Sequence, residues 1–231
     1  MTHTSGLPPY APVSELQEKY GSPNPKGLME YISTCKREFK PQTKFQYSCL
    51  NYITLQHIIE TITGQSLRDF AKENIFDILG MQYTDYLPII QQQDGKWINT
   101  VACPWMDRIA PTEKQKDGSV LCGQVHDPLA RILNGGISGN AGIFSNANDI
   151  GILAAALLNG GEYNGHRILS PLGVKTMCTV PRELTAFGRT PGWDIFSPYA
   201  SNKGDLFSPN TFGHTGYTGT SIIIDPDLSL I

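Results

Sequence analysis

The sequence predicts an α+β domain, in which helices come first along the chain and an antiparallel sheet follows. Between residues 50 and 62, Leu and Ile recur with the spacing of one broad helix face, and Gly64 ends this pattern. The segments 192–196, 221–225 and 228–231 are instead apolar or alternating, and turn residues separate them. Such short apolar segments are typical of strands.

We expect one domain, because no linker, repeat or low-complexity tract divides residues 1–231. Its largely helical and loop region spans about residues 1–180, and its sheet-forming region spans about residues 185–231. The final segment is predicted to return as an antiparallel strand that begins at Leu228 and is cut off at Ile231.

Three shorter helices are predicted by residues that favour helix starts. Ser66, with Asp69 three residues later, has the pattern of a capping box. Ser145 follows a glycine-rich loop and is predicted to cap the next helix, an apolar segment that ends at two glycines. Ser170 comes directly before a proline, the residue favoured at the first helical position. We expect the glycine-rich loop to make a tight turn rather than to hold an anion.

The composition argues against several classes of function. A net charge of −3 and a pI near 5.9 provide no basic surface for nucleic acid. No apolar run reaches the roughly 18 residues of a membrane span, and the first ten residues lack the pattern of a signal peptide. The five cysteines are widely spaced and the five histidines form no H-E-x-x-H motif, so we expect neither a disulfide framework nor a metal site.

One Ser-x-x-Lys sequence occurs, from Ser33 to Lys36. At 15 Ser and 11 Lys in 231 residues, chance alone produces about 0.7 such matches, so the motif has no weight by itself. Neither G-x-S-x-G nor G-x-G-x-x-G occurs.

The segment 211–225, TFGHTGYTGTSIIID, has an unusual start for a strand. Its second half is β-branched and apolar, whereas its first half is crowded with His, Gly and Thr. Glycine weakens a strand unless another backbone or a ligand approaches closely. We therefore expect a close approach at this strand.

Four segments, at residues 2–9, 45–67, 126–150 and 192–226, resemble successive segments of the class C β-lactamase-related serine hydrolases. This group includes class C β-lactamases, DD-peptidases and related esterases. The resemblance covers nearly the whole chain, in the same order. It implies a β-lactamase/transpeptidase-like fold, an antiparallel sheet flanked by helices, here incomplete at both ends.

The resemblance also implies roles for particular residues. Tyr47 matches the Tyr of the family's Tyr-x-Asn motif and would transfer a proton, while Cys49 stands where the family has Asn. His214, Thr215 and Gly216 match the strand that lines the opposite wall of the substrate pocket.

The next residue, Tyr217, stands where the family contributes a backbone N–H to the oxyanion hole. The resemblance implies no cofactor. Because a thiol is a weaker hydrogen-bond donor than an amide, Cys49 weakens the expectation that the protein binds substrate amides.

The family's nucleophile segment precedes the sequence that residues 2–9 match, so we expect it to lie outside this chain. Ser33 comes too late in the chain, only 14 residues before Tyr47, and we reject it as the nucleophile. The chain is expected to be an inactive fragment of an exported serine hydrolase, periplasmic or extracellular, which acts on an ester, a β-lactam or a peptide. The alternative is a non-catalytic binding domain that retains the fold.

Other polar residues lie within the matching segments. His126 and Asp127 are expected to start a turn before a helix, whereas Asn51, one helical turn after Tyr47, and Asn140 receive no role. If His214 contacts a substrate carboxylate, we expect binding of anionic substrates to weaken between about pH 6 and 8, because His has a reference pKa near 6.5.

Overall fold

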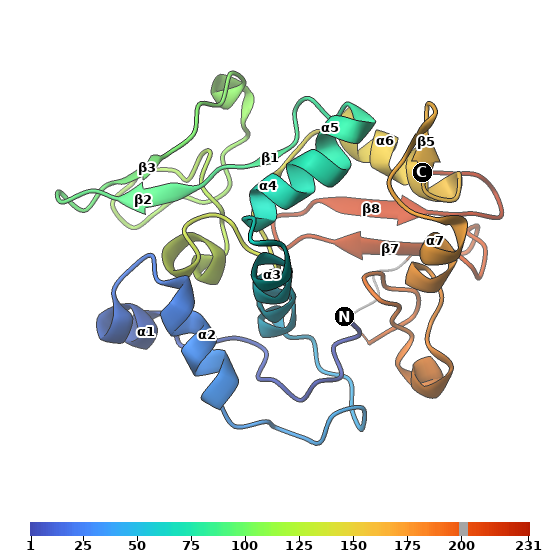
Figure 1. The fold of residues 1–231 in the computed structure, drawn as a ribbon, viewed down its shortest axis with the longest axis horizontal. Helices are drawn as coiled ribbons and strands as arrows, with labels where there is room; N and C mark the ends of the chain where they lie inside the picture. The colour runs from blue at the N-terminus through green and yellow to red at the C-terminus, as the bar shows by residue number, and fades with distance from the viewer. Residues whose placement is uncertain (199–202) are drawn as a thin grey trace.

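The computed structural model describes residues 1–198 and 203–231 (Figure 1). Its helices are α1 (Val13–Tyr20), α2 (Pro25–Thr34), α3 (Cys49–Thr63), α4 (Leu67–Ala71), α5 (Asp77–Leu79), α6 (Ala147–Leu158) and α7 (Pro171–Met177). Two π-helical segments, Lys72–Phe76 and Leu129–Leu133, and two 3-10 segments, Met106–Arg108 and Arg182–Phe187, complete the helical part. The strands are β1 (Asp85–Tyr86), β2 (Ile89–Gln91), β3 (Trp97–Asn99), β4 (Ile143–Phe144), β5 (Glu162–Tyr163), β6 (His166–Arg167), β7 (Phe212–Thr215) and β8 (Ser221–Ile224).

The caps of two predicted helices are confirmed. The Ser66 hydroxyl accepts the Asp69 N–H of α4 at 3.1 Å, and the Ser170 hydroxyl accepts an N–H of α7 at 3.0 Å. The predicted cap of α6 is wrong by one residue, because the Asn146 side chain, not that of Ser145, accepts the first-turn N–H at 2.8 Å. The Ser145 hydroxyl instead bonds to the Thr84 hydroxyl.

Helices α1 and α2 were not predicted. The start of α1 has no side-chain cap, whereas α2 begins after Asn24, which caps it, with a proline at its first position. That pairing of cap and proline could have revealed α2 in the sequence. α2 buries Leu28 and Ile32 against α3, while α1 buries Leu16 beside the π-helical segment Leu129–Leu133, in the same apolar cluster.

Among the described residues, the strands form four two-stranded antiparallel pairs rather than one continuous sheet. β7 pairs with β8, from Phe212 opposite Ile224 to Thr215 opposite Ser221. Figure 1 shows this hairpin on the far side of α3 from the β2–β3 hairpin.

Two predicted strands reduce to single bridges. Segment 192–196 pairs with β7 only at Asp194, opposite Gly213. Beyond this bridge the N–H groups of Ile195 and Phe196 both bond to the Gly188 carbonyl, which turns the chain away from β7.

The predicted strand at 228–231 is likewise wrong, because only Leu230 pairs, with Asp225. The Asp225 carboxylate accepts the N–H groups of Asp227 and Leu228 at 3.0 and 3.1 Å, and these bonds make a turn.

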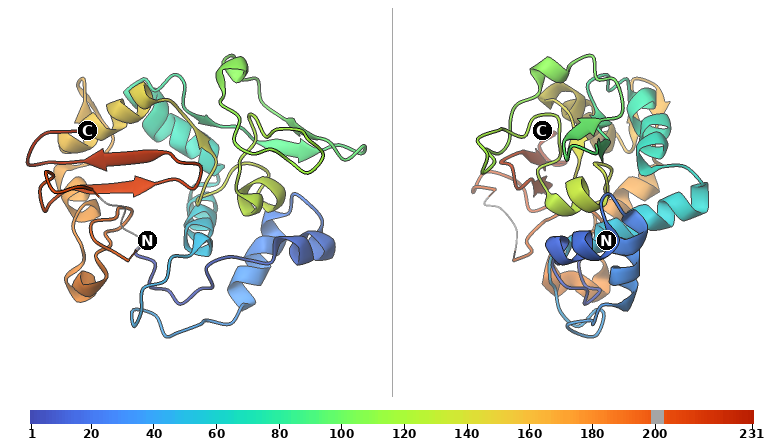
Figure 2. Two further views of the ribbon diagram at one scale, coloured as in Figure 1. Left: turned by 180° about the vertical axis from the view of Figure 1, so that it is seen from behind. Right: turned by 90° about the vertical axis from the view of Figure 1, so that its left-hand side faces the viewer.

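Helices α6 and α7 cover one face of the β7–β8 hairpin. Ala154 and Leu157 of α6 and Val174 of α7 pack against Phe212 and Ile224, which are paired across the two strands. Figure 2 shows the ribbon of these helices and of the hairpin from two other directions. This apolar layer fixes the strand that carries the His-Thr-Gly sequence.

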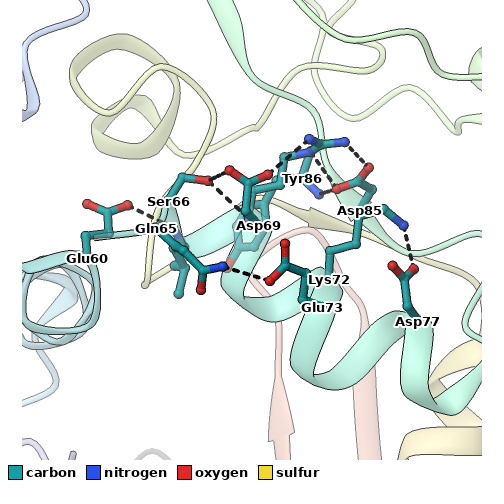
Figure 3. A network of polar contacts seen from close by, with 11 residues as sticks. Glu60, Gln65, Ser66, Asp69, Lys72, Glu73, Asp77, Asp85 and Tyr86 are labelled. Atoms are coloured by element: carbon teal, nitrogen blue, oxygen red, sulfur yellow. Dashed lines mark hydrogen bonds and ion pairs between the residues drawn. The ribbon is translucent and has the colours of Figure 1, made fainter. Parts of the chain in front are cut away.

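A polar network secures α4 at the middle of the molecule (Figure 3). Arg68 donates to both carboxylate oxygens of Asp85, at 2.8 and 2.6 Å, and so ties α4 to β1. Lys72, at the start of the π-helical segment that follows α4, forms an ion pair at 2.5 Å with Asp77 at the start of α5. Within residues 1–198 and 203–231, no helix combines the length and the hydropathy that crossing a membrane requires.

Candidate active site

A cavity of about 210 Å³ lies against β7. Its lining combines Tyr47, which precedes α3, with the His-Thr-Gly strand and with charged side chains from the segment before it. The lining residues are Tyr47, Arg189, Asp194, Lys203, Gly213, His214, Thr215, Gly216, Tyr217 and Ile223. The structure therefore brings together Tyr47 and residues 214–217, which lie far apart in the sequence.

Aromatic and cationic groups surround the Tyr47 ring. It stacks on the His3 imidazole with the ring centroids 4.2 Å apart and an interplanar angle of 23°. The His214 ring is 6.2 Å away, and the Arg189 guanidinium carbon lies 5.4 Å from the Tyr47 ring centroid. A guanidinium at that distance is attracted by the ring electrons.

Arg189 joins His214 to a buried carboxylate. Its Nη1 donates to Asp194 at 2.9 Å, and its Nη2 lies 2.6 Å from His214 Nε2. The Asp194 carboxylate also accepts the Ser197 hydroxyl at 2.6 Å. Backbone bonds in both directions between Asp194 and Gly213 hold this segment on the edge of β7.

Arg189 is a site residue that the sequence did not reveal. It stands in a turn-rich stretch, GRTPGW, that matches no charge or spacing motif. Only the pairing of segment 189–194 with β7 brings its guanidinium to His214, 25 residues along the chain.

The surroundings of His214 favour its neutral form. Burial, and next the Arg189 charge, lower its pKa from the ordinary value of 6.5. Both effects disfavour the imidazolium, on which the expected contact with a substrate carboxylate depends. The permanent positive charge beside the cavity belongs to Arg189 instead.

Lys203 is a second cation in the lining that no sequence pattern predicted. Its ammonium donates to the backbone carbonyls of Thr211, at 2.6 Å, and Ile195. Burial lowers its pKa. The cavity wall thus carries two cationic side chains and one carboxylate, that of Asp194.

The glycines of the β7 segment are required within the hairpin itself. A Cβ atom at Gly213 would lie 2.4 Å from the Ile222 carbonyl oxygen, and one at Gly216 would lie 2.2 Å from the Thr220 hydroxyl. The predicted close approach at this strand is therefore made by β8 and the turn before it. That this strand also lines a substrate pocket, as the family resemblance implies, stays a prediction.

Tyr217 and Cys49 lie differently with respect to the cavity. Tyr217 lines it, is 93% exposed and stacks on His126 with a centroid distance of 5.3 Å. Cys49 is outside the lining, and burial and the Asp127 charge raise the pKa of its thiol to about 11 despite a hydrogen bond with Asn140. Cys49 is therefore an uncharged thiol at neutral pH.

The remaining candidates have structural roles. Asp127 accepts the Ala130 N–H at 2.9 Å and starts the π-helical segment Leu129–Leu133, as predicted. Asn51 is buried and bonds to the His3 ring and the Ser5 hydroxyl. The glycine-rich loop 135–142 packs tightly, since a Cβ at Gly139 would lie 2.0 Å from the Tyr52 carbonyl oxygen.

Ser33 lies outside the cavity lining. It is exposed near the end of α2, and its hydroxyl donates to the Glu30 carbonyl at 2.8 Å. None of the lining residues named above is a serine. Within the described part of the chain, no group of three or more His, Cys, Asp or Glu side chains is arranged to hold a metal ion.

Comparisons with known proteins agree with this geometry. The family model of the beta-lactamases matches residues 1–231. The curated Escherichia coli (strain K12) protein named "Putative D-alanyl-D-alanine carboxypeptidase" is 34% identical over 240 residues, which cover 97% of this chain and 52% of that protein. The chain thus spans about half the length of the curated relatives it matches.

Two solved structures share the fold. An octameric penicillin-binding protein homologue from Pyrococcus abyssi is 20% identical with a TM-score of 0.59, over 99% of this chain and 48% of that one. EstCE1, described as a hydrolase with promiscuous acyltransferase activity, is 19% identical with a TM-score of 0.60, over 99% and 63%. The predicted β-lactamase/transpeptidase-like fold is confirmed, and the chain belongs to the beta-lactamase family.

Proposed function

We propose that this chain forms one wall of the active site of a serine hydrolase, which cleaves an ester or amide through an acyl-enzyme. The observation that carries the proposal is the position of Tyr47. Its ring lies at the cavity, beside both the His-Thr-Gly strand and the Arg189 guanidinium.

The proposed catalytic roles combine the family resemblance with this arrangement. Tyr47 transfers the proton of the nucleophile, and Arg189 supplies a cation beside its ring. The backbone N–H of Tyr217 contributes to the oxyanion hole, and His214, Thr215 and Gly216 form the strand wall. The nucleophilic serine comes from sequence outside residues 1–231, because no lining residue named above is a serine.

The substrate class proposed is a peptide, a β-lactam or an ester that carries a carboxylate. The name of the Escherichia coli relative supports a peptide that ends in D-alanyl-D-alanine. The charges of Arg189 and Lys203 exceed that of Asp194, so the cavity attracts an anion. We place the protein in the periplasm or outside the cell, where such peptides occur, with residues 1–231 as part of one catalytic domain and no nucleic-acid partner.

The longer protein that contains this chain provides the test. We expect it to react with a fluorophosphonate and a fluorescent penicillin and to hydrolyse a small chromogenic ester. Residues 1–231 alone should show no labelling, and Ser33 in particular should stay unmodified. Binding of the penicillin to the longer protein without acylation or turnover would favour the non-catalytic binding domain instead.

A further inference from the structure

We infer that Arg189 is a positioning residue that holds His214 as a neutral imidazole, with its proton on Nδ1 and with Nε2 as a hydrogen-bond acceptor. The inference rests on the proposed function only in treating the cavity at β7 as the active site. The hydrogen bonds of His214 carry it.

Hydrogen-bond directions at the two ring nitrogens assign the tautomer. A guanidinium has donors and no acceptor, so at 2.6 Å from Arg189 Nη2 the Nε2 atom must accept. The Thr215 carbonyl only accepts, so His214 Nδ1, 2.8 Å from it, must donate. Both contacts require the same neutral form, and an imidazolium would point an N–H at the guanidinium.

Arg189 is itself immobilised. The side chains of Arg189 and Asp194 are 2% and 9% exposed, and the planar guanidinium donates to Asp194 through one nitrogen and to His214 through another. The Ser197 N–H and hydroxyl hold the Asp194 carboxylate in turn, at 3.1 and 2.6 Å. The guanidinium therefore cannot turn away to let Nε2 take up a proton.

The other charged and titratable groups around His214 do not reverse this result. They are Asp194, His3 and Tyr47, and Lys203 lines the same cavity with its ammonium bonded to two backbone carbonyls. Asp194 favours the imidazolium, but its carboxylate is already paired with Arg189, and burial acts in the opposite direction. His3 is neutral as well, because burial lowers its pKa to about 3.

One consequence concerns substrate charge. The positive group beside His214 is a guanidinium, which stays charged in proteins. Binding of an anionic substrate should therefore be independent of pH between 6 and 8, the reverse of the expectation based on a His214 imidazolium.

Nitrogen-15 NMR of the imidazoles in the longer protein tests the inference directly, with the His214→Gln spectrum used to identify the His214 signals. We expect a protonated Nδ1, an unprotonated hydrogen-bonded Nε2, and a ring still neutral at pH 6.5, where an unperturbed His is half charged. A proton on Nε2, or half-protonation at pH 6.5 or above, would overturn the inference. This readout needs no turnover, so it is separate from the success or failure of the proposed function.

Variants sharpen the test. In Arg189→Met the His214 ring loses both its hydrogen-bond donor and the neighbouring positive charge, so the pKa of His214 should rise. The KM for an anionic ester should then become pH-dependent between pH 6 and 8. Arg189→Lys, which keeps a cationic donor, and Arg182→Met, which alters an exposed arginine of the preceding 3-10 segment, should leave KM flat. An unchanged His214 titration in folded Arg189→Met would contradict the inference, and if that variant does not fold, the wild-type spectrum decides.

Discussion

Ser33 and Tyr47 are two hydroxyl-bearing residues of this chain that match motifs of serine hydrolases, but their surroundings differ. Ser33 is exposed on α2 and bonds to a carbonyl of its own helix. Tyr47 lies at a cavity, stacked on a buried His3 and beside the buried Arg189. Buried charge and a cavity therefore distinguish the surroundings of Tyr47, at the proposed active site, from those of Ser33, whose motif match is expected by chance.

The largest effect is expected on stability, at the buried ion pair of Arg189 and Asp194 beside Tyr47. Asp194→Ala leaves the Arg189 guanidinium buried without its carboxylate, which costs about 3–5 kcal/mol of unfolding free energy. Chemical denaturation measures the loss, with Asp205→Ala at an exposed position as the control, expected within about 0.5 kcal/mol of wild type. Equal stability of the two variants would mean that the ion pair does not support the site.

The next effect concerns chemistry at Tyr47. In the longer protein, Tyr47→Phe should lower kcat for a small chromogenic ester by about 100-fold or more, because proton transfer loses its hydroxyl. The fold should be unchanged, as circular dichroism would show. Tyr83→Phe, on a ring that lies beside Arg108 away from the cavity, serves as the control, and equal rates for all three proteins would remove Tyr47 from the mechanism.

A third prediction uses the ring that stacks on Tyr47. Burial and the Arg189 charge lower the pKa of His3 to about 3, so between pH 6.5 and 3 the unfolded chain binds a proton that the folded chain does not. Stability is therefore fully present above pH 6.5 and falls as the pH falls, by about 2 kcal/mol at pH 5.

Denaturation at pH 7 and pH 5 measures this slope in wild type, in His3→Gln and in His57→Gln, which changes an exposed histidine of α3. The slope should shrink in His3→Gln alone. An undiminished slope in His3→Gln would assign the proton uptake to other groups, such as His214.

The smallest effect is expected at Ser33. Ser33→Ala removes one hydroxyl that bonds within α2, so activity of the longer protein and its labelling by a fluorophosphonate should be unchanged. Loss of labelling in this variant would show that α2 carries the nucleophile and would reverse the contrast between the two hydroxyl groups.

Local patterns in the sequence were sufficient for the central helices and for half of the site. The apolar spacing of α3, the end at Gly64 and the caps at Ser66 and Ser170 depend on residues within a few positions of one another. The His-Thr-Gly strand and Tyr47 were found through a family resemblance that spans nearly the whole chain. The helices are readable because each depends on contiguous residues, whereas the two site motifs were found because four segments match the family in order.

The charged part of the site is set by long-range packing. Arg189 reaches His214 because Asp194 pairs with Gly213 at a single bridge, and Gly188 then accepts two N–H groups that bend segment 192–196 away from β7. The apolar pattern of that segment predicted a strand, since periodicity records which side chains are buried and not which carbonyl takes each backbone N–H. The neutral state of His214 follows from the same pairing, because burial and a guanidinium from another segment, acting together, decide where its proton resides.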